Sequence, residues 1–114
     1  MNCTVVGNGD TVIFCPESVS LDAYLASEFK AEAYAQVERF CGHVVFDMRN
    51  ITFVDSAGLG AILSVMRLVK SHQKRFVICN MTPQVRSLFE LVRIHKILEI
   101  CNSREEAQSL MVGV

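Results

Sequence analysis

The chemistry that this sequence could perform is concentrated in one acid–hydroxyl pair, Asp55 followed by Ser56. Apolar residues recur after the pair at helical spacing, so the pair is expected at the N-terminus of a helix. The first backbone N–H groups of a helix have no partners within it, and they carry the positive end of the helix dipole. Either side chain could therefore cap the helix, and a hydroxyl placed there lies among hydrogen-bond donors.

Two glycines, Gly58 and Gly60, follow the pair within the predicted first turns of the helix. Glycine inside a helix costs roughly 0.5–1 kcal/mol relative to alanine. Two of them so close together indicate that another backbone or a large ligand must approach this surface. A plainer interpretation is equally open, in which the glycines only let a capped helix pack closely on a strand.

Other reactive side chains are spread through the chain: Cys3, Cys15, Cys41, Cys79 and Cys101, and His43, His72 and His95. The cysteines are odd in number, lack CxxC spacing and mostly lie in or beside apolar runs, so we predict reduced core residues. The histidines form no cluster with the spacing of metal ligands, and no metal site is expected.

Two enzyme-like alternatives fit the sequence poorly. A serine hydrolase would need G-x-S-x-G, but Val54 stands two positions before Ser56, and no histidine or acid suggests a triad. A phosphoacceptor receiver domain would use Asp47. It would also need a pair of acids after the first strand and a lysine after the last parallel strand, and neither is evident.

The elements that must position the pair are predicted from apolar runs and turn residues. Residues 44–47 form an apolar run closed by an acid, typical of a strand buried on both faces, and a connector over 48–54 joins it to the helix that ends near residue 70. Further strands are expected over 3–6, 11–15, 76–79 and 97–100, and further helices over 22–40, 83–92 and 103–111.

The order of these elements predicts the fold class. Turn formers between the first two strands indicate a hairpin, and the helices between later strands indicate parallel pairing. We therefore expect one α/β domain over residues 1–114, with a mixed, mostly parallel sheet and about four helices in the order ββαβαβαβα.

Composition sets the remaining limits. A chain of 114 residues is long enough for one core, and 51% hydrophobic residues imply either helices on both sheet faces or an apolar patch left for a partner. The net charge is −1 and the basic residues are scattered, so no nucleic acid partner is expected. No apolar run approaches the roughly 20 residues that span a bilayer, and no leader segment is visible, so we expect a cytoplasmic protein without direct membrane insertion.

Two blocks of the sequence carry a family resemblance. Residues 53–63, FVDSAGLGAIL, resemble the signature of STAS domains, in particular of bacterial anti-sigma factor antagonists, whose pattern is Asp-Ser-(Ser/Thr/Ala)-Gly-Leu-Gly after a buried strand. Residues 76–89, FVICNMTPQVRSLF, resemble the family's next strand and helix at matching spacing. Residues 19–22, VSLD, keep the Leu-Asp of the family's Gly-Glu-Leu-Asp turn but lack its glycine, and residues 93–94 are Arg-Ile where Gly-Leu is common.

The resemblance implies a protein without enzymatic activity or cofactor that works by partner switching. The unmodified protein would bind an anti-sigma factor that is a serine kinase of the GHKL type. This kinase would phosphorylate Ser56 and so be released, and a serine phosphatase of the PP2C type would restore binding. The partner-binding residues that the resemblance implies are Asp22, Asp55, Ser56, Ala57, Gly58, Leu59, Gly60 and Leu88.

Some of these residues keep a structural alternative. Asp22 could simply favour the positive end of the first helix. Leu59 and Leu88 recur at core spacing and could be buried. The alternative function is a STAS module that is not phosphorylated and acts as a scaffold or as a subunit of a membrane transport complex.

Overall fold

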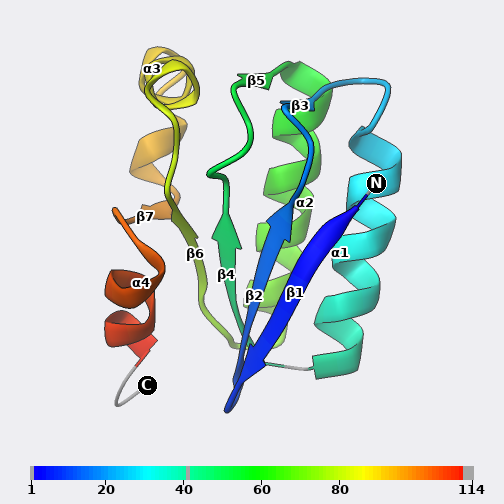
Figure 1. Cartoon of the computed structure of the whole chain (residues 1–114), viewed down its shortest axis with the longest axis vertical. Helices are drawn as coiled ribbons and strands as arrows, with labels where there is room; N and C mark the ends of the chain where they lie inside the picture. Colours follow the sequence, from blue (N-terminus) through cyan, green and yellow to red (C-terminus); the bar gives the residue numbers. More distant parts are fainter. Residues whose placement is uncertain (1, 41, 112–114) are drawn as a thin grey trace.

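The computed structural model describes residues 2–40 and 42–111 and is built around a five-stranded sheet in the order β1-β2-β4-β6-β7 (Figure 1). β1 and β2 form an antiparallel hairpin, and every later pair of neighbours in this sheet is parallel. The predicted mixed, mostly parallel sheet is therefore confirmed. The strands are β1 (Cys3–Asn8), β2 (Thr11–Pro16), β4 (His43–Asp47), β6 (Phe76–Cys79) and β7 (Glu99–Ile100).

The described residues form four α-helices: α1 (Ala26–Phe40), α2 (Ser56–Ser71), α3 (Pro83–Leu91) and α4 (Arg104–Met111). Figure 1 shows α1 and α2 side by side along one face of the sheet and α4 on the other, while α3 stands at the end where the parallel strands finish. A short 3₁₀ turn (η1, Ile94–Lys96) leads from α3 towards β7. No helix among these residues is both long and apolar enough to cross a bilayer.

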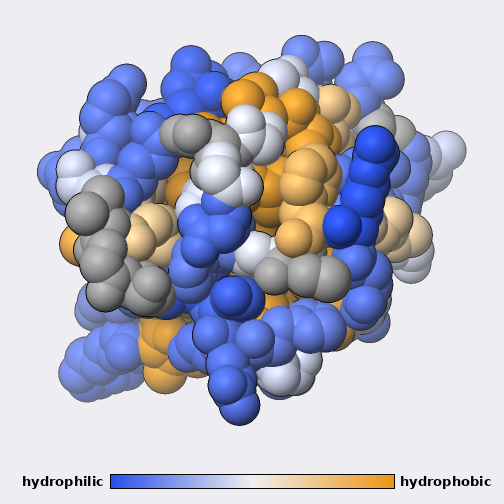
Figure 2. Space-filling model, turned by 90° about the horizontal axis from the view of Figure 1, so that it is seen from below, coloured by the Kyte–Doolittle hydropathy of each residue, from blue (hydrophilic) through white to orange (hydrophobic). Residues whose placement is uncertain are grey.

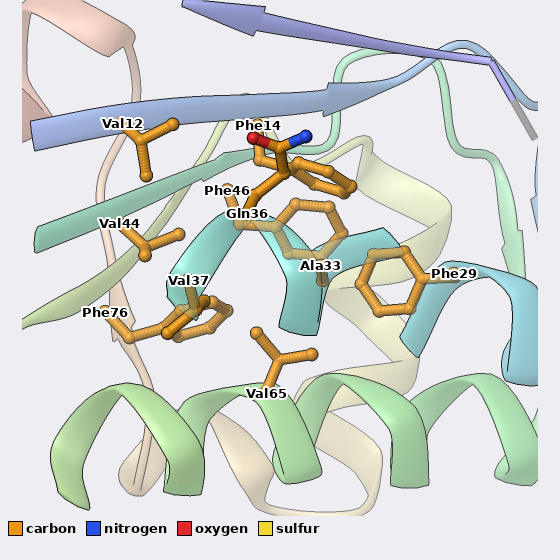
Figure 3. Close-up of a pocket in the computed structure, with 10 residues that line it drawn as sticks. All are labelled: Val12, Phe14, Phe29, Ala33, Gln36, Val37, Val44, Phe46, Val65 and Phe76. Atoms are coloured by element: carbon orange, nitrogen blue, oxygen red, sulfur yellow. The ribbon is translucent and has the colours of Figure 1, made fainter. Parts of the chain in front are cut away.

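The core lies on both faces of the sheet because successive strand residues point to opposite sides. Val44 and Phe46 of β4 face α1 and α2, whereas Val45 of the same strand packs in a second cluster with residues of α4. In the first cluster Phe14, Phe29, Phe46 and Phe76 form successive ring contacts with centroids 5.3–6.3 Å apart. Beside them, Figure 3 shows side chains of α1, α2 and the sheet converging on a cavity of about 10 Å³, so this cavity has no room for a ligand larger than a water molecule.

Two features of the fold differ from the predictions. The connector over 48–54 contains β5 (Phe53–Val54), which pairs in parallel with β3 (Ser20–Leu21) to make a second, two-stranded sheet. The first helix begins at Ala26 and not near residue 22, because residues 22–25 form a turn closed by the backbone carbonyl of Asp22. These two elements lie at the same end of the molecule as the start of α2 (Figure 1).

The opposite end carries apolar atoms bordered by hydrophilic residues, as Figure 2 shows from below. Val6 of β1 and Phe40 at the end of α1 are each 41% exposed, and the Phe40 ring packs against Gly7. Because this end lies away from the N-terminus of α2, its apolar atoms are separate from the surface around Ser56.

Candidate functional site

Ser56 is the first residue of α2 and is exposed. Asp55, not Ser56, is the N-cap: its backbone is extended, and its Oδ1 accepts a hydrogen bond of 2.9 Å from the Gly58 N–H. The Ser56 hydroxyl has no hydrogen-bond partner among residues 2–40 and 42–111. Asp55 is therefore the helix cap and Ser56 carries the free hydroxyl, an assignment that the sequence alone could not make.

Asp55 also ties the N-terminus of α2 to the segment before α1. Its second oxygen, Oδ2, accepts a hydrogen bond of 2.8 Å from the Ala23 N–H, a residue that is 32 positions away in sequence. The hydrogen bond from Gly58 is the larger cause, and with that from Ala23 it holds the pKa of the Asp55 carboxyl below its ordinary value. One ionised carboxylate thus fixes the turn over residues 22–25 beside Ser56.

Asp22 shapes this turn from within. Its Oδ1 accepts hydrogen bonds from the N–H groups of Tyr24 (3.0 Å) and Leu25 (3.2 Å), and the side chain is half-buried. The geometry agrees with the alternative in which Asp22 stabilises the approach to the first helix. Tyr24, next to it, is 92% exposed, and nothing in its sequence neighbourhood distinguished it from a solvent-facing helix residue.

The two glycines of the motif lie in opposite surroundings. A Cβ on Gly58 would stand 2.0 Å from the carbonyl oxygen of Leu21, so this glycine is buried and allows β3 to pack on α2. Gly60 is exposed, and a Cβ there would meet nothing within 4 Å. Close packing therefore explains Gly58, and it does not explain Gly60.

The remaining apolar residues of the predicted surface also differ in how far they are exposed. Ala57 is exposed beside Ser56. Leu59 and Leu88 are half-buried and pack partly against the main core cluster, so each keeps only part of its side chain available at the surface. Phe53 of β5, which the sequence did not single out, is 55% exposed.

Asp55→Asn should separate the two roles of this carboxylate. Asparagine caps helices as well as aspartate does, so the bond to Gly58 can persist, but its amide nitrogen cannot accept from the Ala23 N–H. We expect the free energy of unfolding to fall and the Ala23 amide to exchange markedly faster by NMR. Asp55→Ala, which removes both bonds, should lower the free energy of unfolding further. Unchanged protection of Ala23 in the asparagine variant would contradict the bridging role.

The other candidate reactive groups, Asp47 and Cys79, are buried. Asp47 is fully buried, and its carboxylate accepts hydrogen bonds from Arg104 Nε (2.6 Å), Arg49 Nε (2.9 Å) and Asn80 Nδ2 (3.2 Å), which leaves no room for it to act as a phosphoacceptor. Burial raises the pKa of Cys79 to about 12, so its thiolate is scarce at neutral pH.

The cysteines that the structure describes are unpaired: Cys3, Cys15, Cys79 and Cys101. Three of them are buried, as predicted, Cys3 is half-buried, and Cys41 lies outside the described residues. Within the ranges 2–40 and 42–111, no three His, Cys, Asp or Glu side chains are arranged to hold a metal ion.

The sequence matches the profile of the STAS domain over residues 3–107. It is 33% identical to BtrV of Bordetella bronchiseptica, a protein assigned as an anti-sigma factor antagonist, over 84% of this chain and 82% of BtrV. It is 32% identical to the anti-sigma F factor antagonist of Paenibacillus polymyxa over 60% of this chain and 59% of that protein.

Solved structures share the fold at lower sequence identity. A protein of Thermotoga maritima assigned as an anti-sigma factor antagonist aligns with a TM-score of 0.86 and 19% identity, over 94% of this chain and 92% of its own. The anti-sigma factor antagonist SpoIIAA in its unphosphorylated form aligns with a TM-score of 0.73 and 19% identity, over 99% of this chain and 100% of its own. The phosphorylated form of SpoIIAA, from Bacillus, aligns with a TM-score of 0.70 and 19% identity, over 96% of this chain and 99% of its own. With the profile match over most of the chain and the identity to BtrV, this protein belongs to the STAS-domain family of anti-sigma factor antagonists, which are non-enzymatic proteins.

Proposed function

We propose that this protein is an anti-sigma factor antagonist controlled by phosphorylation of Ser56. The unmodified protein binds an anti-sigma factor that is a serine kinase of the GHKL type, and phosphorylation of Ser56 by that kinase releases it. A serine phosphatase of the PP2C type then restores binding. The observation that carries the proposal is the exposed, unpartnered hydroxyl at the first position of α2, in a motif that matches the family's.

The position suits a switch that changes binding more than folding. A phosphate on Ser56 would add about −1.5 to −2 charges next to the Asp55 carboxylate, and in a packed interface this brings repulsion and a desolvation cost. In the free protein, the positive end of the helix dipole and the backbone N–H groups of α2 favour an anion at the same place. SpoIIAA, which shares this fold, adopts it in both its unphosphorylated and its phosphorylated form.

The binding surface that we infer surrounds Ser56. Ala57 and Gly60 supply its exposed small residues, and the accessible parts of Leu59 and Leu88 add apolar contacts. Asp22, Asp55 and Gly58 hold this surface in shape through the turn over residues 22–25 and the packing on β3. The exposed Tyr24 extends the surface on the same turn.

Substitutions at Ser56 test the proposal directly. Ser56→Ala should change the free energy of unfolding by less than about 0.5 kcal/mol, because the hydroxyl forms no bond in the described structure, and it should bind the kinase but accept no phosphate. Ser56→Asp should weaken kinase binding at least ten-fold, or about 1.4 kcal/mol. Intact mass after incubation with ATP and kinase, peptide mapping and titration calorimetry measure these effects.

Ser71→Asp is the matched control, since Ser71 is an exposed serine at the far end of the same 16-residue helix. It should bind the kinase within two-fold of wild type. If no phosphate forms under any condition and a partner binds Ser56→Asp as tightly as wild type, the switch is wrong. The protein would then be a STAS scaffold or a subunit of a transport complex.

A further inference from the structure

A groove runs between α1 and α2, starting beside Ser56. Both helices begin at the same end of the molecule and descend side by side (Figure 1), and the groove follows their first turns. Its volume is about 410 Å³, in contrast to the cavity of about 10 Å³ in the core. We call it the α1–α2 groove, and it is lined by Ala26, Ser27 and Lys30 of α1 and by Ala57, Gly60, Ala61, Ser64 and Arg67 of α2.

The groove forms because most residues that face each other across it are small. The fold does not require every one of these residues to be small. Gly60 is the clearest case: it lies inside a helix without a positive φ, and a Cβ there would touch nothing. Alanine at this position would favour the helix more strongly than glycine at no packing cost. Packing within the described residues therefore does not explain the missing side chain at Gly60.

The charges that line the groove have one sign. Lys30 comes from α1 and Arg67 from α2, and both are exposed. Neither forms an ion pair with any residue in 2–40 or 42–111, and the nitrogen of Lys30 lies 5.5 Å above the ring of Tyr34. None of the lining residues is acidic, and the hydroxyls of Ser27 and Ser64 add possible hydrogen-bond donors.

We propose that the α1–α2 groove binds an acidic segment of the same serine kinase that recognises Ser56, with carboxylates of the kinase facing Lys30 and Arg67. This inference rests on the proposed function and extends its binding surface from the N-terminus of α2 along three turns of the helix. The occupant is a protein segment because Ala57 and Gly60 belong both to the surface around Ser56 and to the groove, so a partner bound at Ser56 reaches the groove directly. Its acidic character follows from charge complementarity with two cations that form no ion pair with the residues the structure describes.

The groove gives phosphorylation a second way to release the kinase. A phosphate on Ser56 places negative charge at the end of the groove where the acidic segment enters, next to Ala57. The modification would then repel the segment that Lys30 and Arg67 attract, in addition to crowding the contact at Ser56. Binding of unmodified protein should accordingly weaken as salt rises, because the attraction is between exposed charges.

Paired charge reversals test the groove. The double variant Lys30→Glu/Arg67→Glu should bind the kinase at least ten-fold more weakly than wild type at 0.15 M salt. The matched control is Arg39→Glu/Lys70→Glu, which makes the same change in net charge on the same two helices at residues that do not line the groove. The control should bind within three-fold of wild type. The salt dependence of the dissociation constant should be shallower for the groove variant than for the control.

Each outcome decides one of the two proposals. Circular dichroism and thermal unfolding should show that both double variants are folded, because all four substituted residues are exposed. If wild type binds the kinase and the groove variant binds as the control does, the groove proposal is overturned while the function proposed for Ser56 stands. If wild-type, unphosphorylated protein binds no kinase of this type, the proposed function fails, and the occupant assigned to the groove fails with it.

Discussion

Asp47→Asn should lower the free energy of unfolding by about 3 kcal/mol. The Asp47 carboxylate is fully buried and forms ion pairs with two guanidinium groups, those of Arg49 and Arg104, which come from different parts of the chain. Removing one partner of a buried ion pair typically costs 3–5 kcal/mol because the other charge is left without compensation. The side chains of Arg49 and Arg104 remain 50% and 25% exposed and can turn towards water, so we expect the lower end of this range.

The difference in stability between wild type and Asp47→Asn should depend on pH in a defined direction. Burial alone would raise the pKa of Asp47, but the hydrogen bonds from Arg104, Arg49 and Asn80 outweigh it and hold the pKa below the ordinary value. A lowered pKa means that the carboxylate stabilises the fold above the unfolded pKa of about 3.9, and that this contribution is lost as pH falls through the folded pKa. The difference between wild type and Asp47→Asn should therefore be full at pH 7 and shrink below pH 4.

Urea denaturation at pH 7 and at pH 3 measures both effects. Glu105→Gln is the control, since Glu105 is an exposed acid in the first turn of α4, beside Arg104, and its loss should cost less than about 0.5 kcal/mol. Equal stability of wild type and Asp47→Asn at pH 7 would show that the arginines find other partners and that the buried carboxylate is dispensable.

The elements that the sequence predicted correctly are those that depend on residues close together in the chain. The strands predicted over 44–47 and 76–79 are observed as His43–Asp47 and Phe76–Cys79, because a short unbroken apolar run suits a strand that is covered on both faces of its sheet. The start of α2 at the Asp55–Ser56 pair also followed from spacing and capping chemistry, although the choice between the two side chains as cap did not.

The features that the sequence missed depend on residues far apart in the chain. β3 and β5 have two residues each, too few for a periodicity, and they pair with each other although they lie far apart in the chain. The choice of Asp55 as cap is reinforced by Ala23, 32 positions away, and Asp47 is matched by Arg104, 57 positions away. Such contacts follow from the topology, so the sequence alone identified no partner for Asp47 at the end of its strand and left the role of Asp55 open.

Gly58→Ala should lower the free energy of unfolding by about 3 kcal/mol, at the upper end of the usual cost of overpacking. The new Cβ would lie 2.0 Å from the carbonyl oxygen and 2.7 Å from the carbonyl carbon of Leu21, and a backbone group cannot rotate out of the way. Leu21 is also held in place by its pairing with Val54 and by a hydrogen bond of 3.3 Å from the Asp55 N–H. Relieving the clash would separate β3 from α2 and loosen the turn that borders Ser56.

Gly60→Ala makes the same chemical change two residues later and should have the opposite sign. Its Cβ meets nothing within 4 Å, so the higher helix propensity of alanine should raise the free energy of unfolding by roughly 0.5–1 kcal/mol. Urea denaturation should thus show a lower free energy of unfolding than wild type for Gly58→Ala and a higher one for Gly60→Ala. Equal losses of stability in the two variants would show that both glycines are required for packing. Kinase affinity completes the comparison: a Gly60→Ala protein that is more stable yet binds more weakly assigns this glycine to the approach of a partner, because no change in folding could account for the loss.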